Sequence, residues 1–499
     1  MGISFTEKQQ RVIDARGHNL LVSAAAGSGK TAVLVERIVR MVSDSAQPVD
    51  IDRLLVVTFT NAAAAEMRER ISRALNDRLD ADPENEHLQR QTTLLHNARI
   101  TTIDSFCLFV LRNQFHTIGL DPGFRIAEEG ENRLIRQEVL AQVLEDCYTA
   151  GKQEFLDCME YFSVGSRDTA VEEIVLKLYD FAMSTPFPEQ WLKERKRDYR
   201  VSAGARDDQE GAGAAADCSE DMSAGFGSLP WVIDLIRRAR LLLEGCQAKL
   251  SEAIRMCEEP DGPYMYGELL EREKEMVEKL LGRCGAEDSC GDYDALYAAF
   301  AAVHFDRLPS KKDDTVSQVK REIAKGIRTE VKEQLGDLQK KFFFKEKEQV
   351  LKQMEVCGAA VEALVDLTLA FKEAFDAKKR DKNVLDFDDI EHFALEILVR
   401  KDQDGNCVPT DTALEYRSYF HEILIDEYQD SNLVQEYILS CISGEDEGRY
   451  NRFMVGDVKQ SIYKFRLARP ELFLEKYESY GRVEAGEQAN AETTDLHQN

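Results

Sequence analysis

Five short runs rich in apolar residues lie near the two ends of the chain, and each of the first three is followed by a stretch with helical spacing. They begin at Leu20, Arg53, Arg99, His421 and Arg452. Continuous apolar runs of this length are typical of strands buried on both faces of a parallel sheet, and the helical stretches supply the crossovers. The sequence therefore predicts an α/β fold, with a parallel sheet flanked by helices.

The middle of the chain has a different pattern, with long charged stretches of helical period between residues 121 and 380. We expect a large, mainly α-helical inserted domain over this range, between two parts of a motor domain at 1–120 and 381–499. Residues 201–228 contain few large apolar side chains, which predicts a flexible loop within the insertion. The helices are expected at 131–148, 171–183, 231–256, 268–281 and 332–379.

The first apolar run leads into a phosphate loop, Ala24-Ala25-Ala26-Gly27-Ser28-Gly29-Lys30-Thr31, and then into a helix. Glycine lets backbone N–H groups turn toward a triphosphate, and the helix N-terminus adds partial positive charge. Lys30 is expected on the β- and γ-phosphates and Thr31 on Mg²⁺. Ala24 stands where the pattern usually has its first glycine. The alternative is a glycine-rich turn before an ordinary helix, which the flanking strand and helix disfavour.

An acidic pair, Asp426 and Glu427, directly follows the apolar run at 421–425. Carboxylates so close to a core are costly unless they meet cations. We therefore expect Asp426 to hold Mg²⁺ and Glu427 to polarise the attacking water. This hypothesis requires that residues about 400 positions apart share one sheet, and that the insertion folds aside.

Composition limits the partners and the compartment. The 499 residues carry a net charge of −28, which argues against a general nucleic-acid coat protein, because affinity for phosphates comes from Lys and Arg. Any DNA must then follow a local track, and aromatic side chains that stack on bases would provide one. The 11 cysteines show no CxxC pair, which suggests reduced thiols. No run approaches a membrane span and no secretory signal opens the chain, so we expect a cytoplasmic protein without a membrane partner.

Several segments together resemble the UvrD/Rep-type superfamily 1 DNA helicases, and among them the AddA subunits of bacterial AddAB helicase-nucleases. The segments are the phosphate loop, Thr-Phe-Thr-Asn at 58–61, Thr-Ile-Asp-Ser-Phe-Cys at 102–107, Asp-Glu-Tyr-Gln-Asp at 426–430 and the stretch 455–466. The resemblance implies a RecA-like P-loop NTPase, an ATP-driven 3′ to 5′ translocase and helicase in double-strand break repair by homologous recombination. It also implies single- and double-stranded DNA as partners and a heterodimer with an AddB-like subunit.

The resemblance also implies individual roles. Lys30, Asp426, Glu427 and Gln460 are the catalytic candidates, with Gln460 linking nucleotide and DNA. Asp104, one of the DNA-binding candidates given below, stands where many relatives have His. A carboxylate would repel a DNA phosphate, so the resemblance does not extend to a direct phosphate contact by Asp104. ATP would be bound by Gln9, Ala24, Gly27, Ser28, Gly29, Lys30, Thr31 and Arg37, with Mg²⁺ on Thr31 and Asp426. Single-stranded DNA would lie over Phe59, Asn61, Thr102, Asp104, Tyr463, Phe465 and Arg466.

Family members continue into an arginine-bearing motif, a second motor domain and, in AddA, a nuclease domain. We expect this chain to carry the first motor domain and its helical insertion only. A second hypothesis is therefore a module that binds ATP–Mg²⁺ and single-stranded DNA but hydrolyses slowly. A third, a P-loop kinase or transporter ATPase, leaves the aromatic residues after Gln460 unexplained.

Overall fold

The computed structural model describes residues 5–25, 27–163, 168–199, 226–285, 292–311, 313–402, 406–460, 468–481 and 490–496. The chain divides into two compact units. The first comprises residues 1–149, 169–191 and 367–499, and the second comprises 150–168 and 192–366. Parts of the segment expected as a helical insertion, at 121–149, 169–191 and 367–380, are thus grouped with the sheet.

The first unit contains a six-stranded sheet whose paired strands all run parallel, in the order β10-β1-β9-β8-β2-β3. The predicted α/β class with a parallel sheet is confirmed. β9 lies between β1 and β8, so the phosphate-loop strand and the acidic-pair strand share one sheet, as expected. The strands are β1 (Asn19–Ala24), β2 (Leu54–Thr58), β3 (Arg99–Thr102), β8 (Glu422–Ile425), β9 (Arg452–Gly456) and β10 (Ala491–Leu496).

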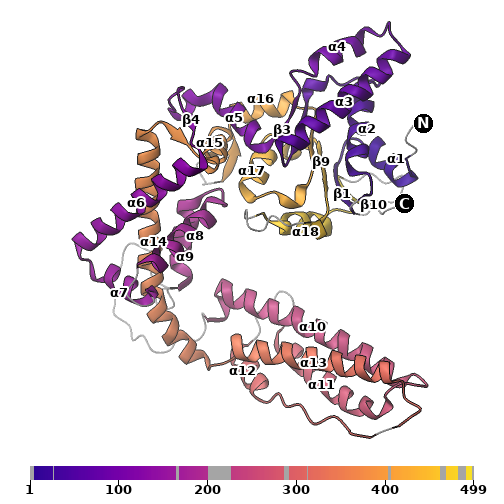
Figure 1. Ribbon diagram of the computed structural model, residues 1–499, viewed down its shortest axis with the longest axis vertical. Helices are drawn as coiled ribbons and strands as arrows, with labels where there is room; N and C mark the ends of the chain where they lie inside the picture. Colours follow the sequence, from indigo (N-terminus) through magenta and orange to yellow (C-terminus); the bar gives the residue numbers. More distant parts are fainter. Residues whose placement is uncertain are drawn as a thin grey trace. The chain divides into compact units, whose positions relative to one another are not determined.

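Alternate residues of each strand enter two hydrophobic cores, because successive side chains point to opposite faces of a sheet. Leu20 and Val22 pack in one core, and Leu21 packs in the other. Helices cover both faces of the sheet (Figure 1). One face is covered by α1 (Glu7–Asp14), α2 (Lys30–Val42), α3 (Asn61–Ala81) and α4 (Glu86–Leu94); the other by α5 (Ile103–Gln114), α15 (Phe387–Leu398), α16 (Asp411–Tyr419), α17 (Leu433–Cys441) and α18 (Pro470–Ser479).

The first unit contains further elements beside the sheet and the helices that cover it. Neither the sheet strand β10 nor the β6–β7 hairpin was predicted from the sequence. The cap of α3 is Thr60, whose side chain accepts from the Ala63 N–H at 3.1 Å. The elements are α6 (Glu129–Ala150), α8 (Thr169–Met183), a parallel pair β4 (Arg125–Ile126) and β5 (Val384–Leu385), an antiparallel pair β6 (Val399–Lys401) and β7 (Cys407–Pro409), and the 3₁₀ turns η1 (Ile51–Arg53), η2 (Phe115–Ile118), η5 (Tyr428–Asp430), η6 (Glu445–Glu447) and η7 (Val458–Gln460).

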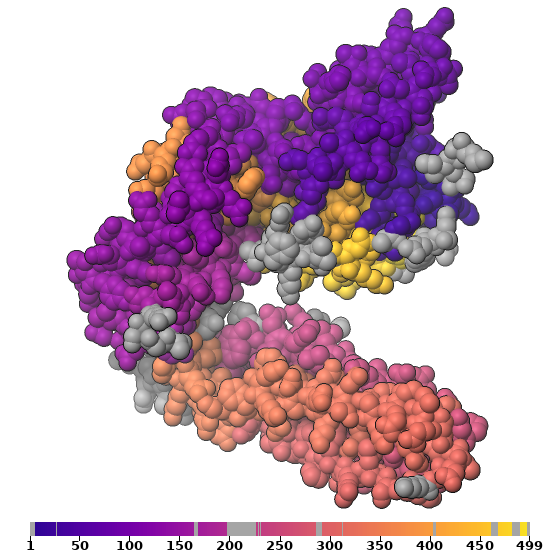
Figure 2. All heavy atoms as spheres, in the orientation of Figure 1, coloured from indigo at the N-terminus to yellow at the C-terminus, as the bar shows by residue number. Residues whose placement is uncertain are grey.

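The second unit is helical and has its own hydrophobic core, formed mainly by α10, α11, α12 and α13. In Figure 2 the atoms of these four helices, coloured pink to orange, pack closely together. The helices α9 and α14 contribute residues to both units, and α6 ends with one residue, Ala150, in the second unit. The helices are α7 (Gln153–Phe162), α9 (Pro188–Tyr199), α10 (Pro230–Glu258), α11 (Gly267–Arg283), α12 (Tyr293–Ala301), α13 (Gln318–Lys341) and α14 (Lys347–Asp381), with the 3₁₀ turns η3 (Phe226–Ser228) and η4 (Tyr264–Tyr266).

The single helix expected at 332–379 is wrong, because α13 ends at Lys341 and α14 begins at Lys347. Three consecutive phenylalanines fall in the gap. Phe343 is buried and stacks on Phe300 at 4.6 Å, and Phe344 is half exposed. The N–H groups of Phe342 and Phe343 both donate to the Leu338 carbonyl, at 3.0 Å and 3.2 Å, and these bonds close the last turn of α13.

The predicted loop at 201–228 lies outside the described residues except for η3. Across the described ranges, no helix is both long enough and apolar enough to cross a lipid bilayer. The nine cysteines that are described as free include the buried Cys107, and burial raises its pKa well above the ordinary value.

Candidate nucleotide site

The phosphate loop has the backbone shape that the sequence predicts. Gly27 and Gly29 adopt φ of +76° and +82°, and a side chain at Gly29 would place its Cβ 3.2 Å from Gln9 Nε2. Gly29 is also the N-cap of α2 and contributes no side-chain cap, so the first N–H groups of α2 remain available to a ligand. The buried Ser28 hydroxyl makes no hydrogen bond within the described structure. Free amide donors and an orphaned hydroxyl at a helix N-terminus suit a phosphate group.

Lys30 and Glu427 form an ion pair across the carboxyl edge of the sheet. Lys30 Nζ lies 3.1 Å and 2.9 Å from the two carboxylate oxygens of Glu427, and the two side chains are 11% and 34% exposed. The two residues are 397 positions apart. The expectation that the two ends of the chain meet at one site is therefore confirmed.

Asp426 and Glu427 owe their orientation to a tight turn after β8. Glu427 has a φ of +51°, a left-handed conformation that is uncommon for a residue with a side chain. Its N–H donates to Asp426 Oδ1 at 3.1 Å. Burial, with the adjacent Glu427 carboxylate adding to it, raises the pKa of Asp426 to about 6. A cation beside Asp426 would favour the charged form, so the donor set fits Mg²⁺, which prefers carboxylate oxygens.

Gln9 lies against the phosphate loop, where the sequence places it. Thr6 and Gln9 form a capping box, in which the Gln9 side chain accepts from the Thr6 N–H at 2.8 Å. Gln9 Nε2 donates to the Ser28 carbonyl at 2.9 Å. The cap therefore fixes Gln9 beside the loop, although in this structure its amide bonds to the loop itself.

Arg37 does not join the site, and the expectation that it contacts the nucleotide finds no support. Its side chain is 2% exposed, donates to Glu422 Oε1 through Nε (3.1 Å) and Nη2 (2.5 Å), and donates through Nη1 to the Val12 carbonyl at 2.8 Å. Its guanidinium also stacks on Phe453 at 4.5 Å. The guanidinium is thus buried and engaged inside the protein rather than presented to a ligand. Ala24 is likewise fully buried at the end of β1.

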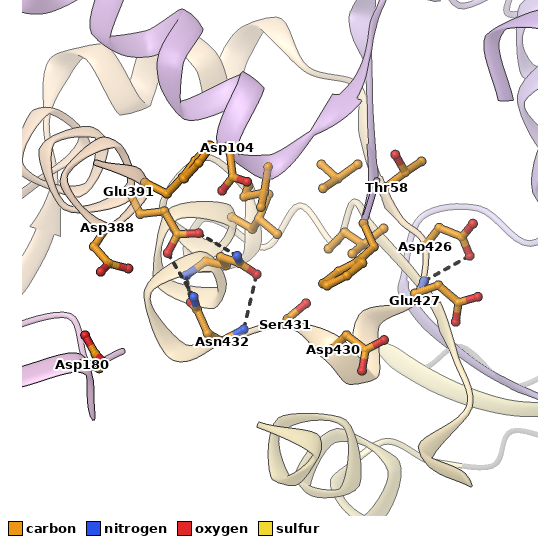
Figure 3. A pocket seen from close by; sticks show the side chains of 17 residues that line it. Thr58, Asp104, Asp180, Asp388, Glu391, Asp426, Glu427, Asp430, Ser431 and Asn432 are labelled. Carbon is orange, nitrogen blue, oxygen red and sulfur yellow. Dashed lines mark hydrogen bonds between the residues drawn. The ribbon is translucent and has the colours of Figure 1, made fainter. Parts of the chain in front are cut away.

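A cleft of about 520 Å³ opens beside the acidic pair (Figure 3). In that view Asp104 and Glu391 lie on one side and Asp426 and Glu427 on the other. Asn432 Nδ2 and Gln435 Nε2 donate to Glu391 at 3.0 Å and 2.7 Å. The lining residues are Val57, Thr58, Phe59, Ile103, Asp104, Asp180, Phe387, Asp388, Glu391, Ile425, Asp426, Glu427, Asp430, Ser431, Asn432, Gln435 and Leu439.

None of the cleft-lining residues in the described part of the chain is basic. Burial, with Asp104 nearby, raises the pKa of Glu391 to about 8, so this carboxyl is largely neutral at pH 7. Even so, the remaining carboxylates repel phosphates. DNA that enters this cleft must present its bases rather than its backbone.

The DNA-binding candidates fall into three groups. Phe59 and Asp104 line the cleft. Asn61 is exposed in the first turn of α3, whereas the Thr102 hydroxyl is occupied, because it caps α5 by accepting from the Ser105 N–H at 3.2 Å. The third group, Tyr463, Phe465 and Arg466, lies outside the described residues.

Sequence reasoning missed Phe387, which lines the same cleft as Phe59 and is 60% exposed. An exposed aromatic ring is a stacking surface for a base. The signal was available, because Phe387 is an aromatic residue between two aspartates directly after a short apolar run.

Gln460, expected to link nucleotide and DNA, ends η7 just after β9. Its Nε2 donates to Asp457 Oδ2 at 2.6 Å, and the Asp457 N–H donates to Gln429 Oε1 at 2.9 Å. Gln460 is therefore connected to the acidic pair through Gln429, a residue that sequence reasoning did not single out.

Known proteins resemble this chain over most of its length. Residues 5–481 match the family model described as the UvrD/REP helicase N-terminal domain. The chain is 48% identical over 482 residues to an ATP-dependent helicase/nuclease subunit from Lachnoclostridium phytofermentans, covering 96% of this chain and 33% of that protein. The proteins of the same name from Acetivibrio thermocellus and Clostridium botulinum are 42% and 41% identical, covering 95% and 96% of this chain and 36% and 37% of theirs. The chain thus spans about a third of the length of these relatives.

Proposed function

Because this chain belongs to the family of UvrD/REP helicase N-terminal domains, we propose that it is the first motor domain of an ATP-dependent 3′ to 5′ DNA helicase and translocase. Its relatives are named as ATP-dependent helicase/nuclease subunits, which supports a role in a helicase-nuclease with an AddB-like partner, in double-strand break repair by recombination. The observation that carries the proposal is the ion pair between Lys30 and Glu427, which joins phosphate loop and acidic pair.

In this proposal Lys30 has two alternative partners. Without a nucleotide its ammonium group binds Glu427. A bound triphosphate would draw Lys30 onto the β- and γ-phosphates, and Glu427 would then be released to orient water and accept its proton. The same ion pair therefore keeps the general base occupied until substrate arrives.

The remaining groups bind and orient the substrate. The N–H groups at the start of α2 and the Ser28 hydroxyl would cradle phosphate oxygens, while Thr31 and Asp426 would hold Mg²⁺. When bound, this ion neutralises charge that develops on the phosphates. Gln9, fixed by the capping box, would lie beside the adenine, whose edge needs one donor and one acceptor.

For the 499 residues alone we propose Mg²⁺–ATP and single-stranded DNA binding with slow hydrolysis. The family resemblance assigns the transition-state arginines to residues beyond those of this domain. Removing such an arginine typically slows phosphoryl transfer by about 10³- to 10⁵-fold.

The test measures binding of a fluorescent ATP analogue and DNA-stimulated ATP turnover by the purified chain. Lys30→Ala is expected to weaken binding by about tenfold or more, which corresponds to about 1.4 kcal/mol. Lys378→Ala removes the same charge in the same unit, where Lys378 pairs with Glu138, and is the matched control. Equal affinities in the wild type and Lys30→Ala would refute the nucleotide site. Brisk turnover that depends on Lys30 would refute slow hydrolysis.

A further inference from the structure

We propose that Lys379 is a positioning residue for single-stranded DNA binding, because it fixes the start of α15, where the exposed Phe387 ring lines the cleft. The inference rests on the proposed function and deepens it, since it names a residue that sets DNA affinity without touching DNA. The observation that carries it is a buried group of carboxylates and cations around the residues next to Phe387.

Phe387 presents its ring with little support from other side chains. It is the first residue of α15, lines the cleft and is 60% exposed. A side chain that must bind in one geometry needs a rigid support, either from packing or from hydrogen bonds behind it. Because packing covers so little of this ring, its direction depends on how firmly the start of α15 is held.

Hydrogen bonds hold the backbone on both sides of Phe387. Before it, the Leu385 carbonyl accepts from the Ala127 N–H at 2.9 Å. Around it, Asp386 and Asp389 form a capping box, in which the N–H of each residue donates to the carboxylate of the other at 2.9 Å. Such a box satisfies N–H groups that the start of a helix leaves unbonded, and so holds the first turn in place. Two carboxylates therefore set the position of Phe387.

Lys379 joins the two halves of this capping box from inside the protein. Its side chain is 3% exposed, and Nζ donates to Asp389 Oδ1 at 2.6 Å and to Asp386 Oδ2 at 3.3 Å. Asp376 Oδ1 lies 3.5 Å away. Although burial opposes the charge, these three carboxylates raise the pKa of Lys379, so its ammonium group stays protonated. One cation thus keeps two buried carboxylates from repelling each other.

A second cation supports the same turn from α6. Arg136 donates to Asp180 at 2.7 Å, and its Nη2 lies 3.6 Å from Asp388 and 3.9 Å from Asp386. Asp180 and Asp388 both line the cleft and lie on the same side of it (Figure 3). The aspartates directly before and after Phe387 are therefore both paired with a cation from another helix.

Stability alone does not explain such a buried group of charges. Replacing a buried ion pair by apolar side chains of similar volume is often neutral or stabilising. What the ion pairs of Lys379 add is direction, because they fix the carboxylates of Asp386 and Asp389 relative to α14. Without the ammonium group the two carboxylates repel each other and the capping box loosens. Phe387 must then be ordered at the moment a base binds, and that ordering lowers affinity.

The test is a thermodynamic cycle on the affinity of the 499-residue chain for oligo-dT, measured by fluorescence anisotropy. The wild type, Lys379→Met, Phe387→Ala and the double variant are compared. Lys372→Met is the matched control, because Lys372 also lies on α14 and is 16% exposed, but pairs with Asp376 at 2.8 Å and Glu189 at 3.3 Å instead of with the capping box.

A second measurement and a second variant guard against loss of folding. The affinity of each protein for a fluorescent ATP analogue, with Mg²⁺, reports whether the first unit is intact. If Lys379→Met does not fold, Lys379→Met with Asp389→Asn takes its place in both backgrounds. The asparagine keeps an oxygen for the Asp386 N–H and removes the carboxylate that would lose its closest cation.

We expect Lys379→Met to weaken oligo-dT binding by about three- to tenfold, because the ring must then be ordered on binding. In the Phe387→Ala background the same substitution should change affinity by less than about twofold, since no ring remains to be positioned. Lys372→Met should also stay within about twofold of the wild type. Nucleotide affinity should be the same in all of these proteins.

Three results would overturn the inference and leave the proposed function standing. They are wild-type oligo-dT affinity in Lys379→Met, wild-type affinity in Phe387→Ala, and a loss in Lys379→Met that is equal in both backgrounds. The last result, together with weaker nucleotide binding, is what a merely structural role of Lys379 would produce. A wild-type chain that does not bind oligo-dT would refute the proposed function, and the inference with it.

Discussion

Replacing Arg37 by Met should destabilise the first unit strongly and leave nucleotide affinity unchanged. The guanidinium and its partner Glu422 are 2% and 8% exposed, so the substitution leaves a carboxylate buried without its cation. Breaking one side of such a pair costs about 3–5 kcal/mol. The Val12 carbonyl also loses its donor at 2.8 Å, and because the two losses share one side chain they do not simply add.

The assay is urea denaturation followed by tryptophan fluorescence. The chain has two tryptophans, Trp191 in the first unit and Trp231 in the second. A Trp231→Phe background therefore makes fluorescence report the first unit alone. With a slope of about 2–3 kcal/mol per M urea, a loss of about 3–5 kcal/mol lowers the midpoint by about 1–2.5 M.

Two further variants separate the buried pair from a general effect of losing charge. Arg40→Met removes an arginine one turn along α2 that is 31% exposed and pairs with Asp14 and Glu36; its loss should be below about 1 kcal/mol. Adding Glu422→Gln to Arg37→Met should restore part of the lost stability, because no unpaired charge remains. The reasoning is refuted if Arg37→Met lowers nucleotide affinity tenfold while the free energy of unfolding changes by less than 1 kcal/mol.

Three other measurements test the site and its support. Burial opposes the charged form of Glu436, but Arg452 and Lys476 lower its pKa from 4.5 to about 2. The stabilisation that this carboxylate contributes is therefore complete above about pH 4.5 and is lost as the pH falls toward 2. In Glu436→Gln the melting temperature should depend less on pH over this range than in the wild type. Mg²⁺–ATP affinity should decline as pH falls through about 6, since protonated Asp426 cannot bind the ion, and Asp426→Asn should abolish this dependence in calorimetric titrations. Phe387→Ala should weaken oligo-dT binding by about 5- to 150-fold in fluorescence anisotropy, and the exposed Phe344 supplies a control substitution that should have no effect.

The sequence was sufficient for those parts of the fold that depend on local pattern. The apolar run before Gly27 and the helix after Lys30 predict β1 and α2, and the acidic pair after an apolar run predicts the end of β8. That Lys30 and the acidic pair lie close together followed from chemistry, because a magnesium–nucleotide site needs both a cation and carboxylates, but the direct ion pair between Lys30 and Glu427 was not predicted.

Features that depend on contacts between residues far apart in the sequence could not be predicted from local sequence pattern. β10 has the sequence Ala-Glu-Thr-Thr-Asp-Leu, which lacks an apolar run, and becomes a strand because β1 offers it a complete ladder of partners. Its Glu492 meets Arg11 at 2.6 Å, 481 residues away. The nucleotide contact that the resemblance implies for Arg37 finds no support, and the sequence could not show why, because its buried partner Glu422 is 385 positions away along the chain.

The strand order has a consequence for synthesis. β1 lies between β9 and β10, and neither exists until residues 452–456 and 491–496 have been made. β2 and β3 can pair with each other early, but β1 must wait about 430 residues for a neighbour. At about 5–20 residues per second this is roughly 20–90 s, during which the six-residue segment Asn19–Ala24, its phosphate loop and α2 remain without the sheet. The nascent chain is therefore expected to need protection from aggregation until translation is nearly through this domain, and slowing the ribosome should increase its dependence on chaperones.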